Sequence, residues 1–411
     1  MNLVYLSYRY VLHKPLQSIL HILLFALGIG LMLLVFQFSE QVLGQARRNV
    51  QGTDLVVGAK GSPLQLILCN IFHVDFPTGN IPLQEADRLA KHPQIEDVLP
   101  LALGDSYQGY RLVGTTMHAL EWYGAKIEQG SIFKNVNEVV LGAKVAEKLG
   151  MTLKDGFHSS HGFSPENADS HEHFHFKVSG ILSKTHTVAD ELIFCGIPAI
   201  WKVHDEHNES LTDTVEYVKY DLLPGSRVPA GSDREITSLL IKYRSPRGAL
   251  QIPRYVNANT NMQSASPAFE LARIQNILGT SSKAIQYLAI AIVVIAILSI
   301  AFNMYNAMQQ RQYDLAVMYS IGAGFRSLYA VLVIEGMILA LGGFVTGLLF
   351  THLAIAYLAG EVEALSMLNT WKFVDMEFYT AIFSLFVGAL SAFIPALKIR
   401  RQNSATILAS G

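Results

Sequence analysis

Histidines are the residues of this chain whose type and spacing point most directly to chemistry. Of 14 histidines, eight fall between His158 and His207, and the stretch HSSHGFSPENADSHEHFHF in this region also carries three carboxylates. Imidazole is a common ligand of zinc and copper. The loop has few core-forming residues, so packing in a hydrophobic core does not explain why so many histidines cluster there. We therefore predict contact with Zn²⁺ or another metal at His158, His161, His171, His173, His175, His204 and His207. The alternative is a solvated loop that binds nothing.

The same segment satisfies the HExxH pattern of zinc metalloproteases through His171, Glu172 and His175. That chemistry needs both histidines on one face of a helix, with the glutamate beside a metal-bound water. Here a loop rich in helix breakers precedes the pattern, and the β-like run FHFKVSGIL follows. On a strand, His171, His173 and His175 share one side and Glu172 faces the other. The sequence therefore favours a strand over a protease helix.

Other chemistry-bearing motifs are few. No G-x-x-x-x-G-K-[ST] segment occurs, so we expect the chain to bind no ATP through a P-loop of its own. A net charge of −2 and a pI near 6.7 exclude the basic field that nucleic-acid binding needs. Cys69 and Cys195 either form one disulfide in an oxidising compartment or stay free, because the sequence alone does not place them.

Long apolar segments decide the fold class. The chain is 51% hydrophobic and only 16% charged, too apolar for an ordinary soluble protein. The four segments are residues 16–38, 284–308, 328–358 and 378–397, and about 20 residues cross a hydrocarbon core of roughly 30 Å. We read the first as an anchor, since it is long for a signal peptide. The sequence predicts an α-helical membrane protein with four transmembrane helices and a large α+β extracytoplasmic domain, residues 39–283, between the first and second.

Basic residues in the short segments predict the orientation. Seven of them flank the cytoplasmic side and one, Lys372, lies in the loop 359–377, and an excess of Lys and Arg marks the cytoplasmic loops. Both termini are then cytoplasmic, with an amphipathic N-terminus (1–15), a cytoplasmic loop (309–327), a periplasmic loop (359–377) and a cytoplasmic tail (398–411). The histidine-rich insertion, about 157–175, lies on the external side.

Two helix patterns suggest how the spans work together. Gly336, Gly343 and Gly347 recur along one face of the third span, which suits close contact with another helix or a second copy. A helical pattern also begins at Pro267 and runs into the second span; unbroken to Met308 it would be roughly 60 Å long. Gly279 could kink this helix. Such a helix suits a force-transmitting stalk, although packing on the external domain explains the same pattern.

The segment after the second span carries a family resemblance. Arg311, Asp314, Leu315-Ala316-Val317 and Ile321-Gly322-Ala323 resemble the RxxEIAxLRAxGA signature of FtsX/MacB-type ABC transporter permeases, with Asp for Glu and Tyr319-Ser320 for Arg-Ala. The run 138–150 resembles the VVLGxxLAxxLG core of the MacB-type periplasmic domain, and 176–182 its FxVxGIL strand. About 20 extra residues separate these two motifs. The C-terminal part of the chain resembles the PAxxAxR motif found near the C-terminus in this family.

The resemblance implies a permease subunit in the bacterial inner membrane that dimerises, with itself or a paralogous permease, and takes a separate ATPase subunit. Contact with that ATPase is implied for residues of the cytoplasmic loop: Arg311, Asp314, Leu315, Met318, Gly322 and Arg326. ATP would then act only through the partner, and a periplasmic partner protein is a further expectation. Alternative substrate classes are lipoprotein release and peptide or drug export. The rival function is a metal-sensing membrane receptor that needs no ATPase.

Overall fold

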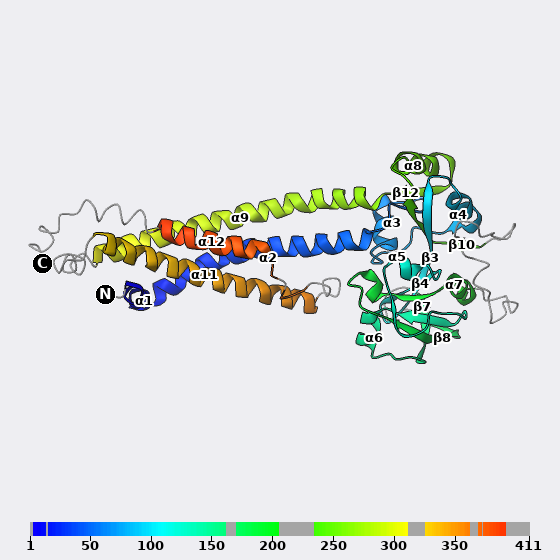
Figure 1. Cartoon of the computed structure of the whole chain (residues 1–411), viewed down its shortest axis with the longest axis horizontal. Coiled ribbons are helices and arrows are strands. Elements are labelled where there is room, and N and C mark those ends of the chain that lie inside the picture. The colour runs from blue at the N-terminus through cyan, green and yellow to red at the C-terminus, as the bar shows by residue number, and fades with distance from the viewer. Residues whose placement is uncertain are drawn as a thin grey trace, which may run out of the picture. The chain divides into compact units, whose positions relative to one another are not determined.

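The computed structural model describes residues 3–13, 15–161, 170–204, 234–310, 325–361, 369–371 and 373–391. The chain divides into two compact units. A helical unit comprises Met1–Leu43 and Asn276–Gly411, and an α+β unit comprises Gly44–Gln275 (Figure 1).

A mixed ten-stranded sheet organises the α+β unit, in the order β12-β1-β11-β3-β4-β9-β6-β8-β5 with β7 paired to β3 and β8. Neighbouring strands in this sheet are antiparallel, except for the parallel pairs β4/β9 and β6/β8. The strands are β1 (Leu55–Ala59), β3 (Ile95–Tyr107), β4 (Tyr110–Thr115), β5 (Ile127–Gly130), β6 (Glu138–Leu141), β7 (Gly156–His161), β8 (Ser170–Leu182), β9 (Ile193–Gly196), β11 (Ser238–Tyr243) and β12 (Met262–Ala265). A separate pair joins β2 (Ile81–Pro82) to β10 (Glu235–Ile236).

Both faces of the sheet are covered, because its strands carry apolar runs in which alternate residues enter different cores. Val139 and Leu141 of β6 belong to one buried cluster, and Val140 between them belongs to a second. A strand with apolar side chains on both sides needs layers on both faces. The helical elements of this unit are α3 (Pro63–Asn70), α4 (Leu83–Ala90), α5 (Ala119–Trp122), α6 (Ala143–Leu149), the 3-10 turn η1 (Val188–Glu191), α7 (Ile197–His204) and α8 (Gly248–Asn259).

Short local patterns account for several of these elements. The α6 helix ends where Gly150 adopts a left-handed conformation with φ of 63°, the usual use of glycine after the last helical residue. Ser62 accepts a hydrogen bond from the Gln65 amide and so caps α3, with Pro63 in the first turn. The run 138–150, which resembles the core motif of the periplasmic domain, forms β6, a turn and α6 in the structure.

The helical unit contains α1 (Leu3–His13), α2 (Pro15–Val50), α9 (Pro267–Gln310), α11 (Phe325–Glu361) and α12 (Asp375–Ser391), of which α2 and α9 extend into the α+β unit. In the part of the chain that the structure describes, three helical segments are long and apolar enough to cross a membrane: Pro15–Val50, Lys283–Phe302 and Tyr329–Glu361. The predicted fourth span falls on α12, of which 17 residues are described, and its end lies outside the described residues. The α9 helix passes through Gly279 without interruption.

The outer surface of these helices is apolar, and exposure of such a surface to water would be unfavourable. Leu20, Phe302 and Tyr357 are 63%, 67% and 67% exposed. The interior between the helices is filled by a cluster that includes Phe25, Ile29, Ile300, Leu339 and Phe344. A packed interior with an apolar exterior is expected for a bundle whose surface faces lipid tails.

Candidate functional site

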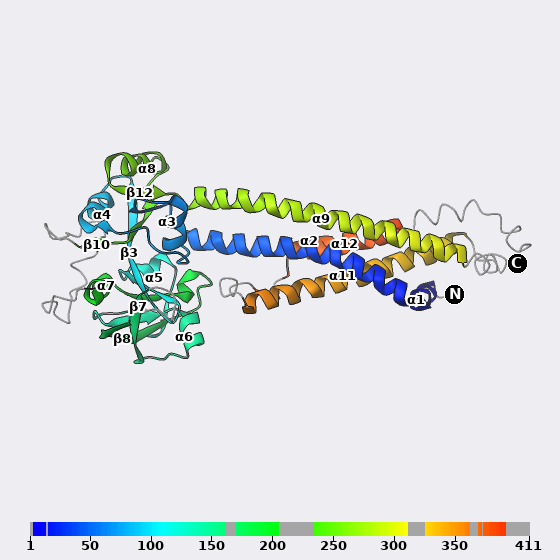
Figure 2. The same ribbon diagram turned by 180° about the vertical axis from the view of Figure 1, so that it is seen from behind.

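The α11 helix lies at the centre of the contacts within the helical unit. It runs beside α12 in both views (Figures 1 and 2). A Cβ atom added to Gly336 would lie 2.3 Å from the Gly388 carbonyl oxygen, and one added to Gly347 would lie 2.8 Å from the Ala26 carbonyl oxygen. At Gly343 the nearest atom would be Cδ1 of Phe25, at 2.8 Å. These three glycines therefore let α11 approach α2 and α12 within the chain, as small residues do between membrane helices.

Hydroxyl groups add polar contacts between the helices. The Thr351 hydroxyl donates to the Gly30 carbonyl at 3.0 Å, and the Ser7 hydroxyl donates to the Val331 carbonyl at 2.9 Å. The Ser299 hydroxyl lies 3.1 Å from Nδ1 of His21. Such bonds hold helices together where no water competes for the groups.

A buried polar group joins three helices at one end of the bundle. Gln37 of α2, His352 of α11 and Glu377 of α12 are 2%, 3% and 6% exposed. The Gln37 side-chain amide donates to Oε1 of Glu377 at 2.9 Å, and Nε2 of His352 lies 3.4 Å from the same oxygen. Buried polar residues of membrane helices are costly and usually have a role.

The surroundings of His352 fix its orientation. Its Nδ1 lies 2.7 Å from the Thr370 carbonyl, and a carbonyl only accepts, so Nδ1 carries hydrogen. The ring stacks on Trp371, with centroids 5.6 Å apart. Since Nε2 then faces a carboxylate, the contact is attractive only when one of the two groups holds a further proton.

Sequence reasoning missed this group. His352 stands inside the third predicted span and Glu377 at the edge of the fourth, both on the predicted external side. The signal that could have found it is an ionisable side chain inside an apolar span, as at His352. Glu335 of α11 is a second residue of this kind and is 6% exposed. The pairing with Gln37, 340 positions away, follows from the packing of the helices.

The predicted contact residues for the ATPase fall in a segment that is mostly not described. Arg311, Asp314, Leu315, Met318 and Gly322 lie outside the described residues. Arg326 belongs to the first turn of α11.

The predicted metal ligands are only partly brought together. His158 on β7 and His175 on β8 are register partners, and Nε2 of His158 lies 3.3 Å from Nδ1 of His175. His161, His171 and His173 also belong to these strands, whereas His204 ends α7 with Nε2 3.4 Å from Oδ1 of Asp105. His207 lies outside the described residues. Among the described residues, no group of three or more His, Cys, Asp or Glu is placed to hold a metal ion.

The HExxH residues lie on β8, so the strand prediction is confirmed. His173 and His175 are both exposed, and Phe174 between them is partly buried. The arrangement lacks the single helical face that a zinc protease needs.

The two cysteines are buried and form no disulfide with each other. Nη1 of Arg111 lies 3.2 Å from Sγ of Cys69, and Nη2 donates to the Asp75 carbonyl at 2.6 Å. Burial raises the pKa of the Cys69 thiol, and nearby Arg111 offsets part of this rise. Burial, together with the charge of Arg111, lowers the pKa of His73 to about 3. These residues form a buried electrostatic cluster in which His73 is neutral at physiological pH.

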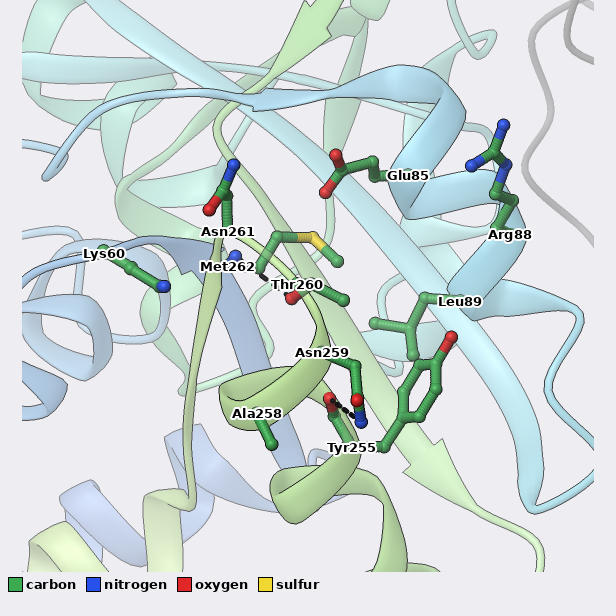
Figure 3. Close-up of a pocket in the computed structure, with 10 residues that line it drawn as sticks. All are labelled: Lys60, Glu85, Arg88, Leu89, Tyr255, Ala258, Asn259, Thr260, Asn261 and Met262. Carbon is green, nitrogen blue, oxygen red and sulfur yellow. Dashed lines mark hydrogen bonds between the residues drawn. The ribbon is translucent and has the colours of Figure 1, made fainter.

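The α+β unit also has a polar pocket of about 470 Å³ between α4, α8 and the segment before β12. Figure 3 shows Glu85 and Arg88 projecting from α4, with Lys60 on the opposite wall and Asn261 near Glu85. Charges of both signs and the two side-chain amides of Asn259 and Asn261 suit this pocket to a small polar ligand rather than an apolar one.

Comparison with known families identifies the chain. The model of the MacB-like periplasmic core domain matches residues 18–233, more than half of the chain, and that of the FtsX-like permease C-terminal domain matches residues 287–404. The chain belongs to the FtsX/MacB-type ABC transporter permeases. As a permease of this type it is the membrane subunit rather than the ATPase, a multi-pass protein with a periplasmic domain, and its family implies an ATPase partner.

Individual relatives of this permease are distant. An uncharacterized ABC transporter permease of Methanocaldococcus jannaschii is 27% identical over 147 residues, covering 34% of this chain and 36% of the relative. The chain thus matches about a third of the length of that relative.

Two solved structures are also similar. The periplasmic region of MacB from Actinobacillus actinomycetemcomitans has a TM-score of 0.34 at 13% identity, and the match covers 56% of this chain and 96% of that one. The extracellular domain of the transporter YknZ from Gram-positive bacteria has a TM-score of 0.30 at 11% identity, covering 52% and 99%.

Proposed function

We propose that this permease transmits ATP-driven motion of a separate ATPase subunit to its periplasmic unit. The observation that carries the proposal is α9, one uninterrupted helix of 44 residues from Pro267 to Gln310. It begins in the α+β unit directly after β12, continues into the helical unit at Asn276, and ends next to the segment that resembles the family signature. A displacement at one end of such a helix is passed along its hydrogen-bonded backbone to the other.

The ATPase contact is proposed for the segment from Arg311 to Arg326, with Asp314 as its central charge. Both termini and this segment are then cytoplasmic, in the bacterial inner membrane, as the distribution of basic residues supports. Two copies, or one copy and a paralogous permease, bring two such segments to two ATPase subunits.

The bundle interior supports action on the periplasmic side rather than passage through one chain. A packed apolar cluster lies in the described core of the helical unit, and α11 is held to its neighbours through close glycine contacts. Work done on a lipoprotein, peptide or other periplasmic partner needs motion of the external unit and no channel within the helices. A link to zinc or another metal is a finer part of the proposal, and it rests on the His158–His175 pair alone.

Co-purification tests the assignment. The proposal predicts that a P-loop ATPase is encoded next to this chain. The two proteins are co-expressed and solubilised together in detergent. We expect the two to elute as one complex. Failure to associate would favour the rival function, a metal-sensing receptor that works without an ATPase.

A further inference from the structure

Burial of two aromatic side chains determines the register of the β7–β8 hairpin. Phe157 and Phe176 are direct register partners, 3% and 0% exposed, and their rings stack with centroids 5.5 Å apart. Because successive residues of a strand face opposite sides, a slip by one position would expose both rings. Burial of this pair therefore places the next two register partners, His158 and His175, opposite each other on the exposed side.

The spacing of the two rings matches a tetrahedral metal site. Nε2 of His158 and Nδ1 of His175 are 3.3 Å apart. Two nitrogen ligands at the usual zinc bond length, in tetrahedral geometry, are about 3.3 to 3.4 Å apart. Neighbouring ligands of a square-planar ion at the same bond length would be only about 2.9 Å apart.

Neighbouring groups hold both rings in place. Nδ1 of His158 lies 3.1 Å from the Phe174 carbonyl. That contact is a hydrogen bond only if Nδ1 carries the hydrogen, which in a neutral ring leaves a lone pair on Nε2, towards His175. The other ring rests against Gly156, where an added Cβ atom would lie only 2.0 Å from Nε2 of His175.

We propose that His158 and His175 form a surface site for a tetrahedral divalent ion, Zn²⁺ in the cell, with water in the remaining positions. On binding, the hydrogen on the His175 ring resides at Nε2, and Nδ1 becomes a ligand. The ion joins β7 to β8 and so strengthens the hairpin. Binding itself needs no ATPase; only its effect on transport rests on the proposed function.

The competing explanation is a hydrogen bond between two neutral rings, which the same distance allows. Titration of the full-length chain in detergent, purified without a polyhistidine tag, separates the two. Co²⁺ serves as the probe, because its visible absorption reports tetrahedral coordination, and Zn²⁺ is added as competitor. We expect one Co²⁺ per chain with a tetrahedral spectrum, displaced by Zn²⁺, and an increase in thermal midpoint with Zn²⁺.

Variants assign the site. His158→Asn and His175→Asn each weaken binding at least tenfold, whereas His173→Asn, on an exposed residue of the same strand, changes it less than twofold. Gly156→Ala keeps both histidines but displaces the His175 ring, so it also weakens binding at least tenfold. Absence of binding to the wild type, or unchanged binding in the His158→Asn, His175→Asn double variant, would overturn the site, as would an equal loss in His173→Asn. None of these outcomes bears on association with the ATPase, so the site and the permease function fail separately.

Discussion

Nε2 of His352 lies 3.4 Å from Oε1 of Glu377, and this contact joins α11 to α12 inside the helical unit. The same oxygen accepts a hydrogen bond from Gln37 of α2 at 2.9 Å. One carboxylate thus gathers side chains from two other helices. Any motion that separates these helices must break the group, which makes it a candidate latch at one end of the bundle.

The coupling within this group is measurable. We expect Gln37→Met and Glu377→Met to be non-additive, with a coupling free energy of about 1 kcal/mol, in the range of interhelical hydrogen bonds in membrane proteins. The measurement is a double-mutant cycle on the free energy of unfolding in mixed detergent micelles. Gln37→Met combined with Glu361→Gln, at the exposed end of α11, is the control pair and should be additive. Additivity in both pairs would show that the contact contributes nothing.

Close packing of α11 against α12 predicts that alanine substitutions at two glycines of α11 change the stability by different amounts. Gly336→Ala places a methyl group 2.3 Å from the Gly388 carbonyl oxygen, so the helices must separate, at a cost of about 1 to 3 kcal/mol. Gly360→Ala meets no described atom within 4 Å and is expected to be neutral or stabilising by up to about 1 kcal/mol. Thermal midpoints in detergent test both. Equal effects would rule out the tight contact.

Buried His73 predicts a proton-linked loss of stability in acid. Its pKa is lowered from 6.5 to about 3, so between these values the unfolded chain binds a proton that the folded chain does not. The free energy of unfolding is therefore fully retained above pH 6.5 and falls, through this group, by up to about 1.4 kcal/mol per pH unit below it. His73→Asn, which suits the positive φ of 55° at this position, should lose less stability than the wild type between pH 6.5 and 4. Parallel curves for the two proteins would contradict the buried neutral state.

The free cysteines allow a clean test of topology. Cys69 and Cys195 are buried, each at 0% exposure, so a membrane-impermeant maleimide should label the folded wild type poorly. With both termini cytoplasmic, Glu361→Cys is labelled in intact spheroplasts and Ser404→Cys only after lysis. The reverse pattern would invert the proposed orientation.

Local patterns explain what the sequence could predict. The run Glu138 to Gly150 contains its own strand, helix and terminal glycine, and the alternation in FHFKVSGIL identifies β8, because these signals depend on neighbours in the chain. The α+β unit after the first helix followed from the distribution of apolar runs.

Such local patterns could not predict contacts between residues that are far apart in the sequence. Gln37 meets Glu377 only because α2 and α12 pack in one register, and no periodicity within either helix encodes that. Likewise, clustering predicted seven histidine ligands, while the strand register that brings His158 to His175 depends on burial of Phe157 against Phe176.

The central claim is coupling of ATP hydrolysis to this permease through the segment that contains Asp314. The most direct measurement is the ATPase rate of the purified complex with wild-type chain, Asp314→Lys, and Glu361→Lys as the control in the predicted periplasmic loop. We expect hydrolysis to depend on the permease, to fall at least fivefold with Asp314→Lys, and to stay within twofold of wild type with Glu361→Lys. Equal rates for all three chains, or hydrolysis that is the same without the permease, would contradict the account.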